Sequence, residues 1–397
     1  MIREFKAAGF KSLNDLTIEL GRINVFVGAN GSGKSNVLEA IGLLSAAASG
    51  RVDDESLSRR GVRLGLPRLY KTSFKSTKTL PHIRLSAISD DSALYQVALL
   101  NPLTDPKPAW SYKTERLDVG DQKVLGSGVR TPKEHPERGL AALKLVELGE
   151  EHPATHLLTR LQNYAIYCPN TPTLRGMIPD QQQRTPLGLF GGGLAEALRY
   201  MGAATAFDDS GRLDDQMASV LDLIDWIKSY GVTARSEALL SASVPRQSEV
   251  IRFTDRFMAE GRNALTAYDA SEGALYIIFA AILALAPIAP SFLAIDNIDQ
   301  ALNPRLARQL MENFCQWVLA AGKNRQVLCT THNPAMLDGL PLDDDRVRLF
   351  TVDRNNEGHT QVRRIQIDDR LAALSKKKDW PLSRLWVEGY IGGVPNV

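Results

Sequence analysis

The chain has 397 residues, of which 44% are apolar and 23% are charged, and its formal net charge is +2. This composition is typical of a folded globular protein and excludes a disordered chain, a collagen-like rod and a coiled-coil rod. The near-neutral charge gives no sign of a generally basic, nucleic-acid-binding protein. Three cysteines occur without close pairing, so neither a disulfide framework nor a zinc site is indicated, and we expect a reducing, cytoplasmic environment.

The N-terminal part predicts a strand, a loop and a helix in direct succession. Ile23 to Val27 is rich in strand-forming residues and is followed at once by glycines. After Ser35, apolar residues recur at three- and four-residue spacing at Val37, Leu38, Ile41 and Leu44, which indicates a helix with one buried face. We therefore expect a glycine-rich loop held between a strand and a helix.

The loop itself, Gly28-Ala29-Asn30-Gly31-Ser32-Gly33-Lys34-Ser35, matches G-x-x-x-x-G-K-[ST] at every fixed position. Glycines let the backbone wrap around phosphates, and the following helix adds the positive end of its dipole. Lys34 supplies a point charge and Ser35 a hydroxyl ligand for Mg²⁺. The pattern predicts that ATP or GTP is bound with Mg²⁺, by the residues Asn30, Gly31, Ser32, Gly33, Lys34, Ser35 and Asn36.

The middle of the chain, residues 101–255, has a different pattern. Prolines punctuate its start, residues 126–133 read as a loop, and helical spacing follows at residues 139–148, 154–164 and 213–230. This predicts an inserted, mainly helical region. The glycine-rich stretch 186–193 has two interpretations, an anion-binding loop or a plain turn before a helix, and the turn is favoured.

The C-terminal part predicts a second group of strands and helices. Strands are expected at residues 292–295, 326–330 and 347–352, with a helix at 305–319, and such alternation indicates parallel β-α units. The apolar run 274–286 is shorter than the roughly 20 residues of a membrane helix, so we expect a buried helix and no membrane association. The predicted division is an N-terminal nucleotide lobe (1–100), the inserted region (101–255), a C-terminal lobe (256–366) and a tail (367–397).

Polar residues stand at the ends of these elements. Asp296 directly follows an apolar strand, where a carboxylate can hold the Mg²⁺ shell. Ser271-Glu272-Gly273 opens the buried helix, where it either caps the helix or faces a phosphate. His332 lies just beyond a strand, where its imidazole either reaches a γ-phosphate or a water molecule or is merely structural. These residues extend the candidate site beyond the phosphate loop.

Together these elements resemble the ATP-binding-cassette ATPases of the SMC, RecF and OLD group. Phe10-Lys11-Ser12-Leu13 is similar to the N-terminal strand pair of RecF- and OLD-type heads. The resemblance implies an α/β, split P-loop ABC-type ATPase head, with Ser271 to Gly273 as the signature, Asp296 as the Walker B acid, Ala301 to Asn303 as the D-loop and His332 as the switch histidine. It also implies a homodimer with composite sites, in which the signature of one subunit closes over ATP held by the other.

The sequence departs from the family at one position. The family usually has a glutamate directly after the Walker B acid, whereas Asn297 stands here. An amide can orient water but cannot take its proton, so ATP hydrolysis is expected to be slow unless Asp299 or His332 compensates. The metal-sensing glutamine of the family has no clear counterpart, and Gln96 is the candidate.

Within the group, the chain looks most like ATPases of prokaryotic anti-phage operons, such as Septu-type and PARIS-type systems. This implies a nucleotide switch that senses an invader and governs a separate effector. The acidic residues of the tail are too scattered for a two-metal nuclease, which is why a nuclease is expected on another chain; they are Asp368, Asp369, Asp379 and Glu388.

Two other functions remain open. A RecF-like repair ATPase would bind DNA directly, and the obvious basic clusters for this are Lys71, Lys75 and Lys78, and Lys376 to Lys378. A subunit of an ABC importer or exporter is disfavoured by the split head. The tail aromatics Trp380, Trp386 and Tyr390 are expected to pack a C-terminal segment onto the core.

Overall fold

A computed structural model describes residues 1–75, 80–129, 135–206, 208, 210–235, 239–241, 244, 248–322, 325–367, 371 and 378–393. Five residues named above lie outside the described residues, namely Lys78, Asp368, Asp369, Lys376 and Lys377. Lys71 is buried, with 5% of its surface exposed, so it does not contribute to a solvated basic face.

The strands are β1 (Ile2–Phe10), β2 (Leu13–Glu19), β3 (Ile23–Val27), β4 (Ile83–Ser89), β5 (Ala93–Leu100), β6 (Ser111–Val119), β7 (Gln122–Val129), β8 (Ile166–Tyr167), β9 (Ile227–Ala234), β10 (Glu249–Asp255), β11 (Ala264–Thr266), β12 (Phe292–Ile295), β13 (Gln326–Thr331), β14 (Val347–Arg354) and β15 (Thr360–Ile365). The helices are α1 (Lys34–Ala48), α2 (Asp54–Ser58), α3 (Pro67–Tyr70), α4 (Ala141–Lys144), α5 (Pro153–Gln162), α6 (Thr171–Leu174), α7 (Leu194–Ala206), α8 (Arg212–Asp222), α9 (Glu272–Leu285), α10 (Pro304–Ala320), η1 (Pro334–Gly339) and α12 (Leu382–Val387). Within the described part of the chain, no helix combines the length and the apolar character that crossing a membrane requires.

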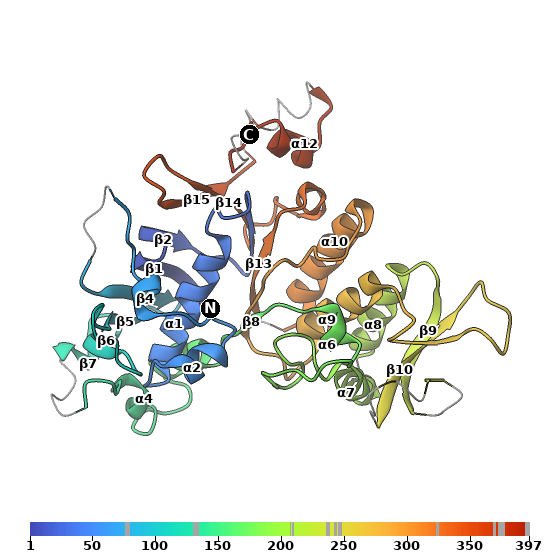
Figure 1. The fold of residues 1–397 in the computed structure, drawn as a ribbon, viewed down its shortest axis with the longest axis horizontal. Helices are drawn as coiled ribbons and strands as arrows, with labels where there is room; N and C mark the ends of the chain where they lie inside the picture. Colours follow the sequence, from blue (N-terminus) through green and yellow to red (C-terminus); the bar gives the residue numbers. More distant parts are fainter. Residues whose placement is uncertain are drawn as a thin grey trace.

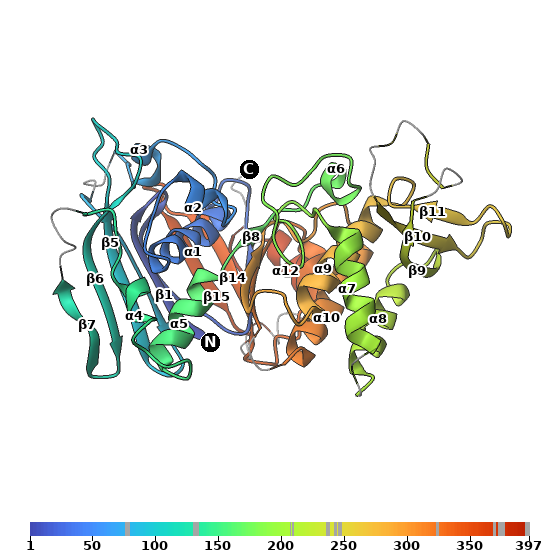
Figure 2. The same ribbon diagram turned by 90° about the horizontal axis from the view of Figure 1, so that it is seen from below.

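The central sheet has the strand order β15-β14-β3-β13-β12-β8, and all its neighbouring strands run parallel except β14 and β15. Every residue of β3, β12 and β13 is buried, because helices cover both faces of the sheet. Figure 2 shows α1 on one side of this sheet and α9 and α10 on the other. The parallel strands and helices predicted from the sequence are confirmed, and the carboxyl ends of these strands share one edge.

A second sheet is antiparallel, with the order β2-β1-β4-β5-β6-β7. It packs against the face of α1 that points away from the central sheet, and this leaves α1 almost wholly buried between the two sheets (Figure 2). The N-terminal strand pair expected from Phe10 to Leu13 is confirmed as β1 and β2, which pair in antiparallel register. The α/β split head is therefore the observed fold.

The middle region differs from the expected mainly helical insertion. Strands β6 and β7 extend the antiparallel sheet, and β8 pairs with β12 at the edge of the central sheet. The prolines after residue 100 mark the turn between β5 and β6 and not a domain boundary. The expected loop at 126–133 is a strand as far as Val129, because β7 pairs with β6 there. A separate projection begins only with α7, α8 and the small sheet β11-β10-β9 (Figure 1).

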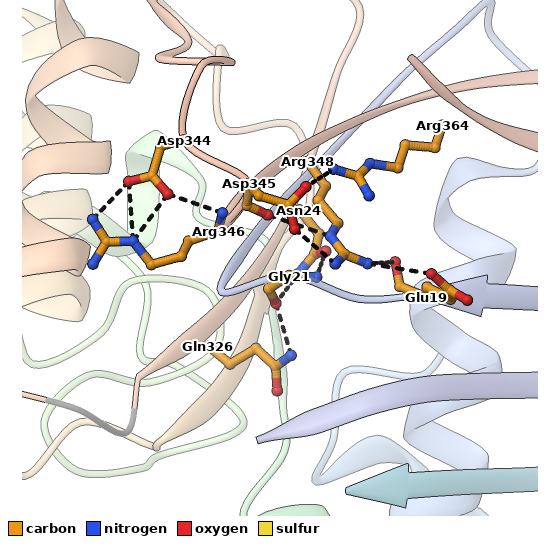
Figure 3. Close-up of polar contacts among 9 residues, drawn as sticks. All are labelled: Glu19, Gly21, Asn24, Gln326, Asp344, Asp345, Arg346, Arg348 and Arg364. Atoms are coloured by element: carbon orange, nitrogen blue, oxygen red, sulfur yellow. Dashed lines mark hydrogen bonds and ion pairs between the residues drawn. The ribbon is translucent and has the colours of Figure 1, made fainter. Parts of the chain in front are cut away.

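Buried polar contacts join the two halves of the chain at the amino ends of the central strands. The Gln326 side chain accepts the N–H of Ile2 at 3.0 Å and donates to the carbonyls of Ile2 at 2.7 Å and Gly21 at 2.8 Å. Asn24 accepts the N–H of Gly21 at 2.7 Å. Figure 3 shows these side chains converging on Gly21. Because an unpaired buried polar group costs about 1–3 kcal/mol, this network fixes the N-terminal strands to the C-terminal half.

The glycine-rich stretch 186–193 is a turn in which the N–H groups of residues 188–192 already have acceptors. The buried carboxylate of Asp180 accepts N–H groups from Gln182 at 2.8 Å, Phe190 at 2.8 Å and Gly192 at 3.0 Å. The Asp180 carboxylate therefore already binds the N–H groups that an external anion would need. The interpretation as a turn before α7 is the one that the structure supports.

Candidate functional site

The phosphate loop connects β3 to α1 at the carboxyl edge of the central sheet. Gly33 has φ 111°, in the left-handed region, and a Cβ there would lie 2.0 Å from Thr360 Oγ1. A Cβ on Gly28 would lie 2.2 Å from the carbonyl oxygen of Val352. Both positions therefore require glycine. Among the described residues, the N–H groups of Gly31 and Gly33 have no hydrogen-bond partner, which leaves them free to bind an anion.

The Lys34 side chain lies inside the curve of this loop. Its Nζ donates to the carbonyls of Gly28 at 2.7 Å and Ala29 at 3.0 Å. Burial lowers the pKa of Lys34, and the carboxylates of Asp296 and Asp299 oppose this shift. The lysine ammonium and both acids therefore lie close together, although the acids come from the far end of the sequence.

Ser35 and Asp296 meet at the start of α1 and the end of β12. Ser35 Oγ donates to Asp296 Oδ2 at 2.9 Å, and Thr330 Oγ1 donates to Asp296 Oδ1. The N–H of Asn297 donates to Thr330 Oγ1 at 2.8 Å, which fixes the turn after the strand. A hydroxyl and a carboxylate in contact are ligands that suit Mg²⁺. The structure thus brings together the two residues expected to hold the metal.

Asp299 and His332 form a second polar pair at the same edge. Asp299 Oδ2 lies 3.3 Å from His332 Nδ1 and accepts the His332 N–H at 3.5 Å. The Asp299 side chain is 2% exposed, whereas that of His332 is 55% exposed. Asp299 Oδ1 is buried and has no hydrogen-bond partner in the described residues. Asp299 can therefore orient the imidazole through Oδ2, while its buried Oδ1 remains an unused acceptor among the described residues.

Ser271 to Gly273 begins α9 away from the phosphate loop. Ser271 is the N-cap residue, yet its exposed hydroxyl makes no cap hydrogen bond. A Cβ on Gly273 would lie 3.4 Å from the carbonyl oxygen of Ala301, so the expected signature and D-loop are neighbours. No hydrogen bond or ion pair between described residues joins Ser271–Gly273 to the loop. The interpretation of Ser271 as a simple helix cap is not supported, because its hydroxyl accepts no hydrogen bond from the first amides of α9.

Arg175 is a polar residue that sequence reasoning missed. Its Nη2 donates to the carbonyl of Ala270 at 3.0 Å, directly before Ser271. Its Nε is buried without a hydrogen-bond partner, and no carboxylate lies within ion-pair distance in the described residues. A cation next to a helix N-terminus is unfavourable unless an anion lies nearby, and Glu272 provides one carboxylate in the first turn of α9. No local sequence signal marks Arg175, because the contact spans 95 residues.

Gln96 does not lie at this edge. It is in the middle of β5, paired with Ser86 and Arg116 in the antiparallel sheet. The strand next to Asp296 is β8, and the main-chain carbonyl of Tyr167 accepts the N–H of Asp296 at 2.8 Å. The next residue is Cys168. The pKa of its thiol is raised, mainly by burial and to a smaller extent by the negative charge of Asp296. Cys168 therefore follows the end of β8, near the carboxylate of Asp296.

The turn between β1 and β2 braces the phosphate loop from the other side. Asn36 Nδ2 donates to Ser12 Oγ at 2.7 Å, and Ser12 Oγ lies 2.7 Å from Thr360 Oγ1. Thr360 Oγ1 in turn donates to the carbonyl of Ser32 at 2.7 Å. Asn36 was expected to bind nucleotide. In this structure its side chain instead supports the phosphate loop indirectly, through hydrogen bonds that run from Asn36 to Ser12, Thr360 and the carbonyl of Ser32.

Comparisons with known proteins agree with this geometry. The family described as "AAA domain, putative AbiEii toxin, Type IV TA system" matches residues 23–118 and 205–338, more than half of the chain. The DNA replication and repair protein RecF of Leifsonia xyli subsp. xyli (strain CTCB07) is 33% identical over 85 residues, covering 21% of this chain and 22% of that protein. RecF of Clostridium novyi (strain NT) is 28% identical over 141 residues, covering 31% of this chain and 39% of that protein. The chain thus spans well under half the length of these relatives.

Among solved structures, an SmcHead bound to the C-winged helix domain of ScpA is similar, with a TM-score of 0.52 and 15% identity. The similarity covers 92% of this chain and 98% of that chain. It shows a shared fold, the split α/β head.

Proposed function

Because the chain belongs to this AAA domain family and is an ATPase of the SMC and RecF group, we propose that it binds ATP with Mg²⁺ and hydrolyses it slowly as a nucleotide switch. The observation that supports this most is the meeting of Lys34, Ser35 and Asp296 at one edge of the sheet. The free amides of the loop fit phosphate, and the Ser35–Asp296 contact fits a hard cation.

Each residue has a distinct role in this proposal. The loop amides and Lys34 would hold the β- and γ-phosphates, and Ser35 and Asp296 would hold Mg²⁺. The metal would neutralise charge that develops on the phosphate oxygens. Asp299 would keep His332 directed at the γ-phosphate or at the attacking water. Asn297 would orient that water without taking its proton, which is the reason for expecting slow turnover.

A homodimer with composite sites is part of the proposal. Ser271 has an unused, exposed hydroxyl at the positive end of α9, and Arg175 adds a cation beside it. Glu272 places a carboxylate in the first turn of the same helix, and no hydrogen bond or ion pair between described residues joins this surface to the chain's own phosphate loop. A γ-phosphate held by a second copy would accept the Ser271 hydroxyl and pair with Arg175.

The biological role proposed is the sensor and regulator of a separate, nuclease-like effector in anti-phage defence. The description of the matching family refers to a toxin and to a toxin–antitoxin system, and this supports a chain that works with a separate partner. The second candidate is a RecF-like repair ATPase that binds DNA directly, and the RecF matches named above give it weak support, because each covers less than half of that protein.

Phosphate release with ATP and Mg²⁺ tests the ATPase. Lys34→Ala should abolish it, whereas Lys71→Ala is a matched control, because Lys71 is also buried and donates to a carbonyl, that of Pro81 at 3.0 Å, outside the site. Equal rates for both variants would refute the assigned site. Fluorescence anisotropy with gapped duplex DNA separates the two roles, since ATP-dependent DNA binding by the chain alone favours the repair ATPase.

A further inference from the structure

The C-terminal segment, residues 378–393, is anchored to the loop that follows His332. The carboxylate of Asp338, in η1, accepts the Ser383 N–H at 2.9 Å and the Ser383 hydroxyl at 2.6 Å. Leu385 and Trp386 of α12 are buried, as predicted for the Trp386 side chain. Because η1 begins two residues after His332, α12 is tied to the same loop as the candidate switch histidine.

The other part of the segment lies on the phosphate loop. The carbonyl of Gly393 accepts the N–H of Ala29 at 3.2 Å. Gly393 has φ 76°, and a Cβ there would lie 3.2 Å from Thr351 Cβ and 3.3 Å from Trp386 Nε1. Gly393 is thus packed between β14 and α12. A larger residue would push the chain away from Ala29.

A cavity of about 750 Å³ separates the rest of the segment from the phosphate loop. Residues 29–32 of the loop form one wall, the ends of β14 and β15 form another, and Glu388, Gly389, Gly392 and Gly393 complete it. Any movement of the segment therefore changes the surroundings of loop residues that carry free amides. Figure 1 shows α12 beyond the carboxyl ends of the central strands, next to β14 and β15.

We propose that residues 382–393 position the phosphate loop for ATP by tying it to the loop that carries His332. The inference rests on the proposed binding of ATP at Lys34 and Ser35. Ser383 and Trp386 are positioning residues, because among the described residues Ser383 binds Asp338 and Trp386 packs beside Gly393, and neither contact is with the phosphate loop itself. Linkage requires that ATP strengthens docking of the segment by the same factor by which docking strengthens ATP binding.

Calorimetry with ATP and Mg²⁺ tests this in the full chain. Ser383→Ala should weaken ATP binding about fivefold or more, the lower end of usual coupling factors, and Trp386→Ala should weaken it further. Ser383→Thr keeps the hydroxyl and should restore wild-type affinity. Ser219→Ala is the matched control, since that hydroxyl donates to the carbonyl of Gln216 at 2.6 Å and accepts the Trp317 Nε1–H at 2.9 Å, in α8 and away from the loop. Hydrogen exchange should show ATP protecting residues 388–393 in wild type but not in Lys34→Ala.

Two results would overturn the inference while leaving the ATPase intact. The first is an unchanged affinity for ATP in Ser383→Ala and Trp386→Ala when hydrogen exchange shows that residues 388–393 have lost their protection. The second is tighter binding, which would mean that the segment competes with ATP. If wild type itself failed to bind ATP, the proposed function and the inference would both be refuted.

Discussion

Asn297→Glu would place a carboxylate directly after Asp296, where the proposed ATPase lacks a general base, and the structure predicts two separate effects. Asn297 has φ 55°, in the left-handed region, and its N–H is held by Thr330 Oγ1 at 2.8 Å. Asparagine tolerates this conformation better than glutamate. The substitution should therefore strain the turn while adding a general base.

The magnitudes of the two effects differ. The left-handed conformation costs an ordinary residue about 1–2 kcal/mol, so the free energy of unfolding should fall by about 1 kcal/mol. General-base assistance is worth about 10² to 10⁴ in rate, so hydrolysis should rise about a hundredfold, or about 2.7 kcal/mol in the barrier. Because the strain is present before and during the reaction, it should not reduce this gain as long as the turn stays folded.

Phosphate release at saturating ATP measures the gain, and Asn297→Gln is the matched control. Glutamine has the length of glutamate and the same backbone strain, but it lacks the charge and the basicity. Thermal unfolding should show similar losses for both variants, whereas only the glutamate should speed hydrolysis. Equal rates for the two variants, together with a fast wild type that Asp299→Asn abolishes, would show that Asp299 is the functional acid.

Further predictions concern binding, assembly and stability. Lys34→Ala should remove ATP binding measured by calorimetry, because it removes the cation inside the loop; unchanged affinity would contradict the site. Ser271→Arg should abolish ATP-dependent dimerisation in light scattering, and unaltered association would contradict composite sites. Asp180→Ala should lower the free energy of unfolding by about 3 kcal/mol, because three partly buried amides lose their acceptor, and a near-neutral effect would show that water replaces it. Burial raises the pKa of Glu115, so the folded chain keeps a proton that the unfolded chain has lost, and stability should fall as pH rises from the ordinary to the raised pKa. Glu115→Gln should flatten this fall in denaturant titrations across pH; an unchanged slope would contradict the assignment.

The sequence by itself determined the features that depend on neighbouring residues. The strand, phosphate loop and helix from Ile23 to Ala48 were predictable, because the loop's glycines, Lys34 and Ser35 follow one another in the chain. Asp296 and His332 were also identifiable, since both directly follow buried parallel strands whose carboxyl ends meet at one edge. Their roles in catalysis stay predictions.

Only the tertiary structure decided which distant residues surround that edge. It brought β8 next to Asp296, Arg175 next to Ala270, and Gly393 onto Ala29. It also revealed β6 and β7 where a mainly helical insertion was expected. Such contacts leave little trace in local periodicity, because strand pairing and loop docking are decided by burial against segments far away in the chain.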